Sequence, residues 1–120
     1  MPTLAIRGAI TADANTEDAI LAAARQLLVE IASSNHLVPE EVISVLFTIT
    51  PDLDAAFPTR AARELGWTQV PLLDAQQPRV RGDLARCIRV LLHFQRQRAP
   101  DSVHHVYLGA ARALRPDLSP

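Results

Sequence analysis

The sequence predicts a single two-layer α/β domain, in which helices cover one face of a mixed sheet of four to six strands. Segments with the two-residue alternation of strands occur near the start of the chain and again after residue 86, and one long segment between them has the 3.6-residue period of a helix. The length of 120 residues suits one domain with one core. We therefore expect residues 1–120 to form one domain, with residues 112–120 as a flexible C-terminal cover.

The first elements are predicted in the order strand, helix, strand. Residues 3–11, TLAIRGAIT, alternate in polarity and predict a strand that ends near Gly8. Residues 15–35 carry an apolar stripe at helical spacing, with Asn15 or Thr16 as the N-cap. A short turn at VPEEV precedes a β-branched strand over residues 43–50.

The second half is predicted to hold shorter elements. Pro58 and Gly66 suit the two ends of a helix over residues 58–65. The segment TQVPLL, interrupted by its proline, predicts a short edge strand, and residues 74–86 read as a long surface loop. A strand over residues 87–95, a last short strand VHHVYL and a helical turn with a polar tail complete the chain. Because the second sheet face also looks apolar, we expect a homo-oligomer built through the sheets.

Charge and cysteine content narrow the possible partners. The chain has 12 basic and 13 acidic residues and a net charge of −1, so no overall field favours nucleic acid or a membrane. The single cysteine, Cys87, excludes an intramolecular disulfide and favours a reducing compartment. We find neither a signal-peptide pattern nor a membrane-spanning run, and expect a cytoplasmic protein.

Arginines inside strands are the most informative polar residues. In the strand over residues 87–95, Arg89 shares a face with Cys87 and Leu91. A guanidinium keeps its proton, so a half-buried arginine needs an anion. Arg7, in the first strand, raises the same question. The anion is either a ligand or a buried Asp or Glu of the chain itself.

Other chemistry finds little support in the sequence. The lone cysteine lies in a core pattern and no nucleophile motif occurs. His104 and His105 are adjacent and point to opposite faces of a strand, and His93 has no carboxylate at ligand spacing, so we expect no metal. Converging arginines would bind a carboxylated or phosphorylated small molecule. The candidates, with Tyr107 as a neutral donor, are Arg7, Arg60, Arg63, Arg89 and Arg115. The alternative is that Arg60, Arg63 and Arg115 are merely solvated charges.

Four separated motifs resemble a known family. IRGAIT, TPDLDAAFPTRAARELGW, CIRVLLHF and HVYLGAARALRPDL, in this order and spacing, are similar to the trimeric α/β class of chorismate mutase, from about residue 5 to residue 118. The resemblance implies a homotrimer with its sheets packed into a barrel-like core and active sites at subunit interfaces. It also implies the cofactor-free rearrangement of chorismate to prephenate, which feeds phenylalanine and tyrosine synthesis.

The resemblance also implies roles for individual residues. Arg89 is the cation that stabilises charge on the breaking ether oxygen, Arg7 grips a carboxylate and Tyr107 donates to the same side. The wall and the mobile cover of the substrate pocket are implied for Phe57, Arg60, Arg63, Leu73, Leu114 and Arg115.

One loop departs from the family pattern. The family's pocket glutamate falls on Gln77, and a small family residue falls on Asp74. We favour Asp74 as the replacement carboxylate, and the alternative is that Asp74 only caps a turn. Because a carboxylate beside Arg89 is missing at 77, two further possibilities stay open: a trimeric dicarboxylate-binding module with weak or lost turnover, and an enzyme for a related dicarboxylate.

Overall fold

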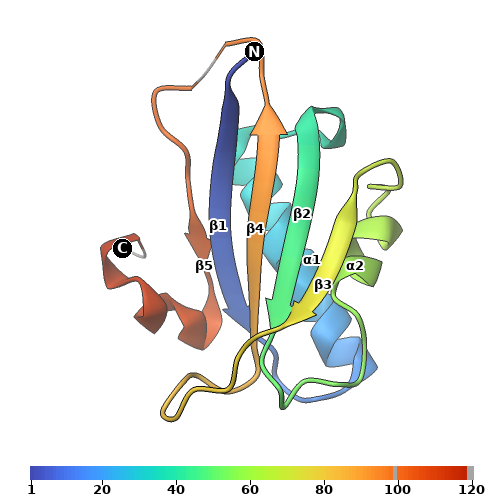
Figure 1. Ribbon diagram of the computed structural model, residues 1–120, viewed down its shortest axis with the longest axis vertical. Helices are drawn as coiled ribbons and strands as arrows, with labels where there is room; N and C mark the ends of the chain where they lie inside the picture. The colour runs from blue at the N-terminus through green and yellow to red at the C-terminus, as the bar shows by residue number, and fades with distance from the viewer. Residues whose placement is uncertain (99, 119–120) are drawn as a thin grey trace.

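The computed structural model describes residues 1–98 and 100–118 and contains one mixed sheet of five strands. Its order is β3-β2-β4-β1-β5, with parallel pairs β2/β3 and β1/β5 at the two edges and antiparallel pairs between (Figure 1). The strands are β1 (Thr3–Thr11), β2 (Val42–Ile49), β3 (Leu72–Gln76), β4 (Cys87–Gln95) and β5 (Val106–Tyr107).

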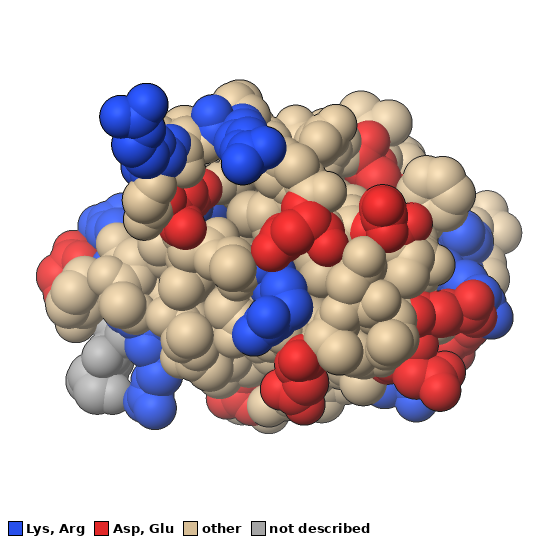
Figure 2. All heavy atoms as spheres, turned by 90° about the horizontal axis from the view of Figure 1, so that it is seen from below, with Lys and Arg blue, Asp and Glu red and all other residues tan. Residues whose placement is uncertain are grey.

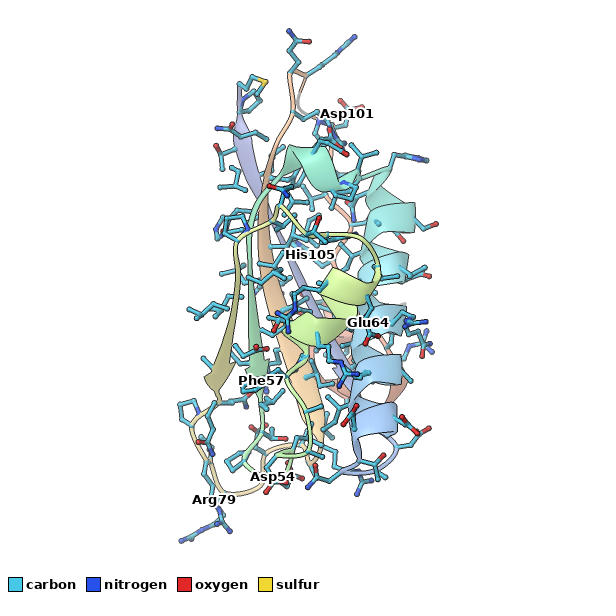
Figure 3. The ribbon with its side chains drawn as sticks, turned by 90° about the vertical axis from the view of Figure 1, so that its right-hand side faces the viewer. Asp54, Phe57, Glu64, Arg79, Asp101 and His105 are labelled. Atoms are coloured by element: carbon cyan, nitrogen blue, oxygen red, sulfur yellow. The ribbon has the colours of Figure 1, made fainter. Side chains whose placement is uncertain are left out.

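Helices α1 (Glu17–Asn35) and α2 (Thr59–Glu64) lie on one side of the sheet, which the edge-on view shows clearly (Figure 3). The predicted two-layer α/β fold is thereby confirmed. Short 3₁₀ turns are η1 (Pro39–Glu41), η2 (Gly109–Leu114) and η3 (Pro116–Leu118). None of the described helices has the length and apolar content that crossing a membrane requires.

The long helix forms where its caps and apolar stripe predict it. The Thr16 hydroxyl accepts a hydrogen bond from the N–H of Ala19 at 3.1 Å, and two acidic residues occupy the first turn. Leu27, Leu28 and Ile31 are fully buried against the sheet face that carries Phe47 and Phe94. This core fixes which face of each strand looks away from the helices.

Gly8 lets three elements meet closely. A Cβ at this position would lie 2.9 Å from the carbonyl oxygen of Val106 and 3.1 to 3.2 Å from side chains of α1. Only glycine therefore allows β5 to pair with β1 while α1 covers both. That pairing sets Ala9 beside Tyr107.

The structure corrects three predicted boundaries. β1 continues past Gly8 to Thr11, because β4 pairs with it over its whole length. The edge strand begins after Pro71 and runs to Gln76, since β2 supplies backbone partners to residues that read as loop. β5 has two residues, because the Asn35 side chain bonds the backbone N–H and C=O of His104 and diverts the chain before Val106.

The sheet face opposite the helices is open. The register places Leu73, Leu46, Leu91 and Arg7 in one row across it and Ala75, Thr48, Arg89 and Ala9 in the next. The side chain of Leu73 is among the most exposed large apolar groups of the molecule. The face is therefore a mixture of small, aliphatic and arginine side chains.

Candidate active site

Three of the predicted polar residues share the open face near one sheet edge. Ala9 pairs with Arg89 on one side and with Tyr107 on the other, and Arg7 lies two residues before Ala9. Together with Leu114 and Arg115 they line a hollow of about 380 Å³, which we call the arginine groove. Its floor is made by backbone and side chains of β1, β2 and β4, including Leu46, Thr48 and Leu91. Three guanidinium groups border one small space.

Arg89 is only partly paired. Its Nη2 lies 3.4 Å from Oδ1 of Asp83, and its side chain is 38% exposed. Its Nε is buried and has no hydrogen-bond partner among the described residues. The arginine thus meets an acid of its own chain and still keeps a donor for a ligand.

Gln77 and Asp83 extend the groove. A second hollow, of about 590 Å³, is lined by these two residues and the turn between them, and it shares Thr48 and Arg89 with the arginine groove. The Gln77 amide donates from Nε2 to Oδ2 of Asp83 at 2.5 Å. Sequence reasoning missed Asp83, which looked like a loop residue. The sequence feature that could have pointed to Asp83 is that no other acid occurs between Asp74 and Arg89.

Asp74 does not lie beside Arg89 of its own chain, so within one chain it does not replace the missing carboxylate. It pairs in register with Phe47, whose side chain is in the helix-covered core, so it points to the opposite face of the sheet. Its carboxylate accepts hydrogen bonds from the N–H and the hydroxyl of Thr59, at 3.1 and 2.6 Å. Asp74 therefore holds the first turn of α2.

The remaining predicted wall residues lie around the β3 edge. Phe57, Arg60 and Asp74 line a third hollow, of about 500 Å³, which we call the edge hollow. Phe57 is 68% and Leu73 65% exposed, although both are large apolar side chains. Arg60 bonds Glu17 and Glu64, and Arg63 bonds the Thr59 hydroxyl at 3.4 Å. One chain does not bring these residues to the arginine groove.

The C-terminal segment closes one end of the groove. Ala110 donates its N–H to the Thr11 hydroxyl at 3.2 Å, and buried Ala111 packs beside Ala9 and Cys87. Leu114 and Arg115 follow, and Arg115 forms an ion pair with Asp117 at 2.9 Å. The predicted cover over residues 112–120 is described here to residue 118, and its last two residues lie outside the described part.

Two titratable groups beside the groove have shifted pKa values. Burial, then the positive charges of Arg7 and Arg115, lowers the pKa of His105. Burial raises the pKa of the Cys87 thiol, which keeps it protonated and poorly nucleophilic. At the end of the molecule seen in Figure 2, acidic and basic side chains are mixed, and the net charge of the chain is −1, so the cationic groove is a local feature. Within residues 1–98 and 100–118, no three His, Cys, Asp or Glu side chains gather as metal ligands would.

Comparison with known proteins identifies the family. The family model described as chorismate mutase type I matches residues 3–118. The chain belongs to this family. The resemblance seen in the sequence motifs is thereby confirmed.

Relatives of the type I chorismate mutase family match over nearly their whole length. Chorismate mutase AroH of Bacillus subtilis is 47% identical over 115 residues, which are 95% of this chain and 91% of that protein. Chorismate mutase AroH of Thermus thermophilus is 47% identical over 114 residues, 94% of this chain and 93% of that protein. A chorismate mutase from Clostridium thermocellum has a solved structure that matches with a TM-score of 0.88 and 44% identity, covering 92% of this chain and 98% of that one.

Proposed function

We propose that this protein carries out the chorismate mutase reaction, the rearrangement of chorismate to prephenate, in the arginine groove. Membership of the type I family supports the activity. The observation that carries the location is the convergence of Arg7, Arg89 and Arg115 on one hollow beside Tyr107. Prephenate would then enter phenylalanine and tyrosine synthesis. The free thiol of Cys87 favours the cytoplasm as the compartment.

The chemistry of chorismate fits this cationic groove. The substrate carries two carboxylates, and planar guanidinium groups bind carboxylates through paired hydrogen bonds. As the ether C–O bond breaks, negative charge develops on its oxygen, and a fixed cation there stabilises the transition state more than the ground state. In this proposal Arg89 donates to the ether oxygen, Arg7 and Arg115 hold carboxylates and Tyr107 adds a neutral donor. Holding the flexible substrate in its compact shape supplies the rest, and no cofactor takes part.

The second half of each site would come from a neighbouring subunit. The edge hollow and the exposed Phe57 and Leu73 lie at the β3 edge, whereas Tyr107 and Arg115 lie at the β5 edge. A homotrimer that packs its open sheet faces together would place the β3 edge of one chain over the arginine groove of the next. Phe57, Arg60, Arg63, Leu73 and Asp74 would then form the far wall. Burying the exposed apolar side chains would stabilise this assembly.

Steady-state kinetics test the activity, because chorismate absorbance falls only when the substrate is consumed. A binding module would retain the ligand without this loss. The family match favours the enzyme over that alternative, and over an enzyme for another dicarboxylate.

Subunit mixing tests the shared site. An Arg89→Ala chain and a Phe57→Ala chain should each be poorly active alone. After unfolding and refolding together, mixed trimers should contain some sites with both native halves, and activity should rise above the sum of the two. If mixing restores nothing while both variants still associate, the two residues serve the same site of one chain.

A further inference from the structure

Asp83 joins the two polar side chains beside the arginine groove. Its Oδ2 accepts from the Gln77 amide at 2.5 Å, and its Oδ1 accepts from the Leu84 N–H at 2.8 Å and lies 3.4 Å from Arg89 Nη2. The Asp83 side chain is 22% exposed. A carboxylate held by several donors and largely removed from water forms strong, well-oriented hydrogen bonds.

The bonds to Asp83 leave one buried polar atom of Gln77 and one of Arg89 without a partner among the described residues. Gln77 Oε1 and Arg89 Nε are buried and have no hydrogen-bond partner among the described residues. Both side chains border the same hollow of about 590 Å³. A buried acceptor and a buried donor without partners are costly, so their presence together indicates a ligand that offers one donor and one acceptor.

The carboxylate also decides which end of the Gln77 amide remains available. An ionised carboxylate only accepts hydrogen bonds, so the amide must turn its NH₂ group toward Asp83. The carbonyl oxygen, Oε1, is then left for an incoming donor. Without Asp83 the amide could turn around and present its NH₂ group instead.

We propose that Asp83 is a positioning residue of the chorismate mutase site, a step that rests on the function proposed above. It orients Gln77 so that Oε1 accepts a hydrogen bond from the substrate hydroxyl, and it holds Arg89 so that Nε faces the substrate. The negative charge beside Arg89 is thus supplied from residue 83, while residue 77 is neutral.

A purely structural role for Asp83 makes a different prediction. The Asp83 N–H bonds the carbonyl of Val80 at 3.1 Å in a turn where Gly82 has a φ of +82°. If the side chain only stabilised this turn, its loss would lower the melting temperature and leave kinetic constants unchanged. If it positions Gln77 and Arg89, kinetic constants change in a protein that melts normally.

The first experiment compares Asp83→Ala, Asp83→Asn and wild type. Because a hydrogen bond to a charged group is lost, Asp83→Ala should lower kcat/KM by about 10- to 100-fold. The kcat/KM of Asp83→Asn should lie between those of Asp83→Ala and wild type. Its amide oxygen still accepts a hydrogen bond from Gln77, but the negative charge beside Arg89 is gone. Asp101→Ala, which removes an exposed acid at the opposite end of the molecule from Arg79 (Figure 3), is the control and should match wild type.

The second experiment places a new acid against Asp83. In Gln77→Glu two carboxylates would face each other at hydrogen-bond distance, so they should share a proton at low pH and repel each other once both ionise. The kcat/KM of Gln77→Glu should therefore fall relative to wild type as the pH rises from about 6 to about 9. In the double variant Gln77→Glu with Asp83→Gly a single carboxylate remains, and this fall should disappear. Asp83→Asn, which keeps the size of the side chain and an acceptor oxygen, tests the idea if Asp83→Ala does not fold.

The outcomes separate this inference from the proposed function. Wild type that leaves chorismate intact overturns the proposed function and the inference with it. Active wild type, together with Asp83 variants of unchanged kcat and KM, overturns the inference alone. A Gln77→Glu variant whose kcat/KM equals or exceeds that of wild type at every pH also overturns the inference alone.

Discussion

The imidazole Nδ1 of His105 accepts a hydrogen bond from the backbone N–H of Arg7 at 2.9 Å, and so joins residues 98 positions apart. His105 directly precedes β5, so this side-chain bond stands in place of a hydrogen bond between strands. It also fixes the backbone that carries Arg7. The bond requires a neutral Nδ1. The folded protein therefore favours the unprotonated ring.

This bond predicts that stability falls in mild acid. The pKa of His105 is lowered in the folded state, first by burial and then by Arg7 and Arg115, so the unfolded chain binds more protons below its ordinary pKa of about 6.5. The His105 contribution is fully present above about pH 6.5 and is lost as the pH falls toward the folded pKa. Melting temperature measured from pH 8 to 5 should drop more for wild type than for His105→Gln. His36→Asn, at an exposed helix end, should follow wild type.

Arg89 is predicted to act electrostatically. Arg89→Ala should lower kcat by at least about 10²-fold, on the scale of removing one preorganised donor to a developing oxyanion, while the protein still folds. Arg89→Lys should also have a low kcat, because an ammonium group lacks the planar set of donors of a guanidinium. Arg98→Ala, at an exposed position beyond β4, is the matched control. Near-full activity of Arg89→Ala would assign this arginine a structural role only.

Asp74 is predicted to matter for stability more than for turnover. Asp74→Ala removes the acceptor for the Thr59 N–H at the start of α2 and should cost about 1 kcal/mol, as the loss of a helix cap does. Asp74→Asn keeps an acceptor and should leave kcat close to wild type. Thermal melts and chorismate kinetics on both variants provide the check. A large loss of kcat in Asp74→Asn would show that this carboxylate takes part in catalysis.

The C-terminal segment is predicted to hold the bound anion. Deleting residues 112–120 removes Arg115 and one wall of the groove but keeps buried Ala111, so KM should rise more than kcat falls. Deleting only residues 119–120 is the control. Unchanged kinetics after the longer deletion would show that the segment takes no part in binding.

Oligomeric state is predicted to depend on the open sheet face. Wild type should have the mass of a trimer by light scattering at micromolar concentration. Leu73→Glu places a charge on an exposed apolar position of this face and should weaken assembly, whereas Val29→Glu, at a half-exposed position on α1, should not. A monomer mass for wild type would contradict both the trimer and the shared site.

The features that depend on local periodicity and capping could be predicted from the residues alone. Alternation along residues 87–95 fixes Arg89 on the face opposite Phe94, and the stripe after Thr16 fixes which side of α1 is buried. These features hold for almost any tertiary arrangement, because each arises from neighbours in the chain. The family motifs added the expected chemistry.

Which acid accompanies Arg89 depends on contacts between segments that are distant in the sequence. Asp74 and Asp83 both stand near the gap left at Gln77 in the sequence, and spacing gave no reason to prefer the second. Pairing of β3 with β2 turns Asp74 toward α2, while the turn before β4 brings Asp83 to Arg89 and Gln77. Edge-strand register and loop conformation follow from hydrogen bonds between segments that are distant in the sequence. The residues next to Asp74 or Asp83 in the chain do not indicate which distant segment will supply these bonds.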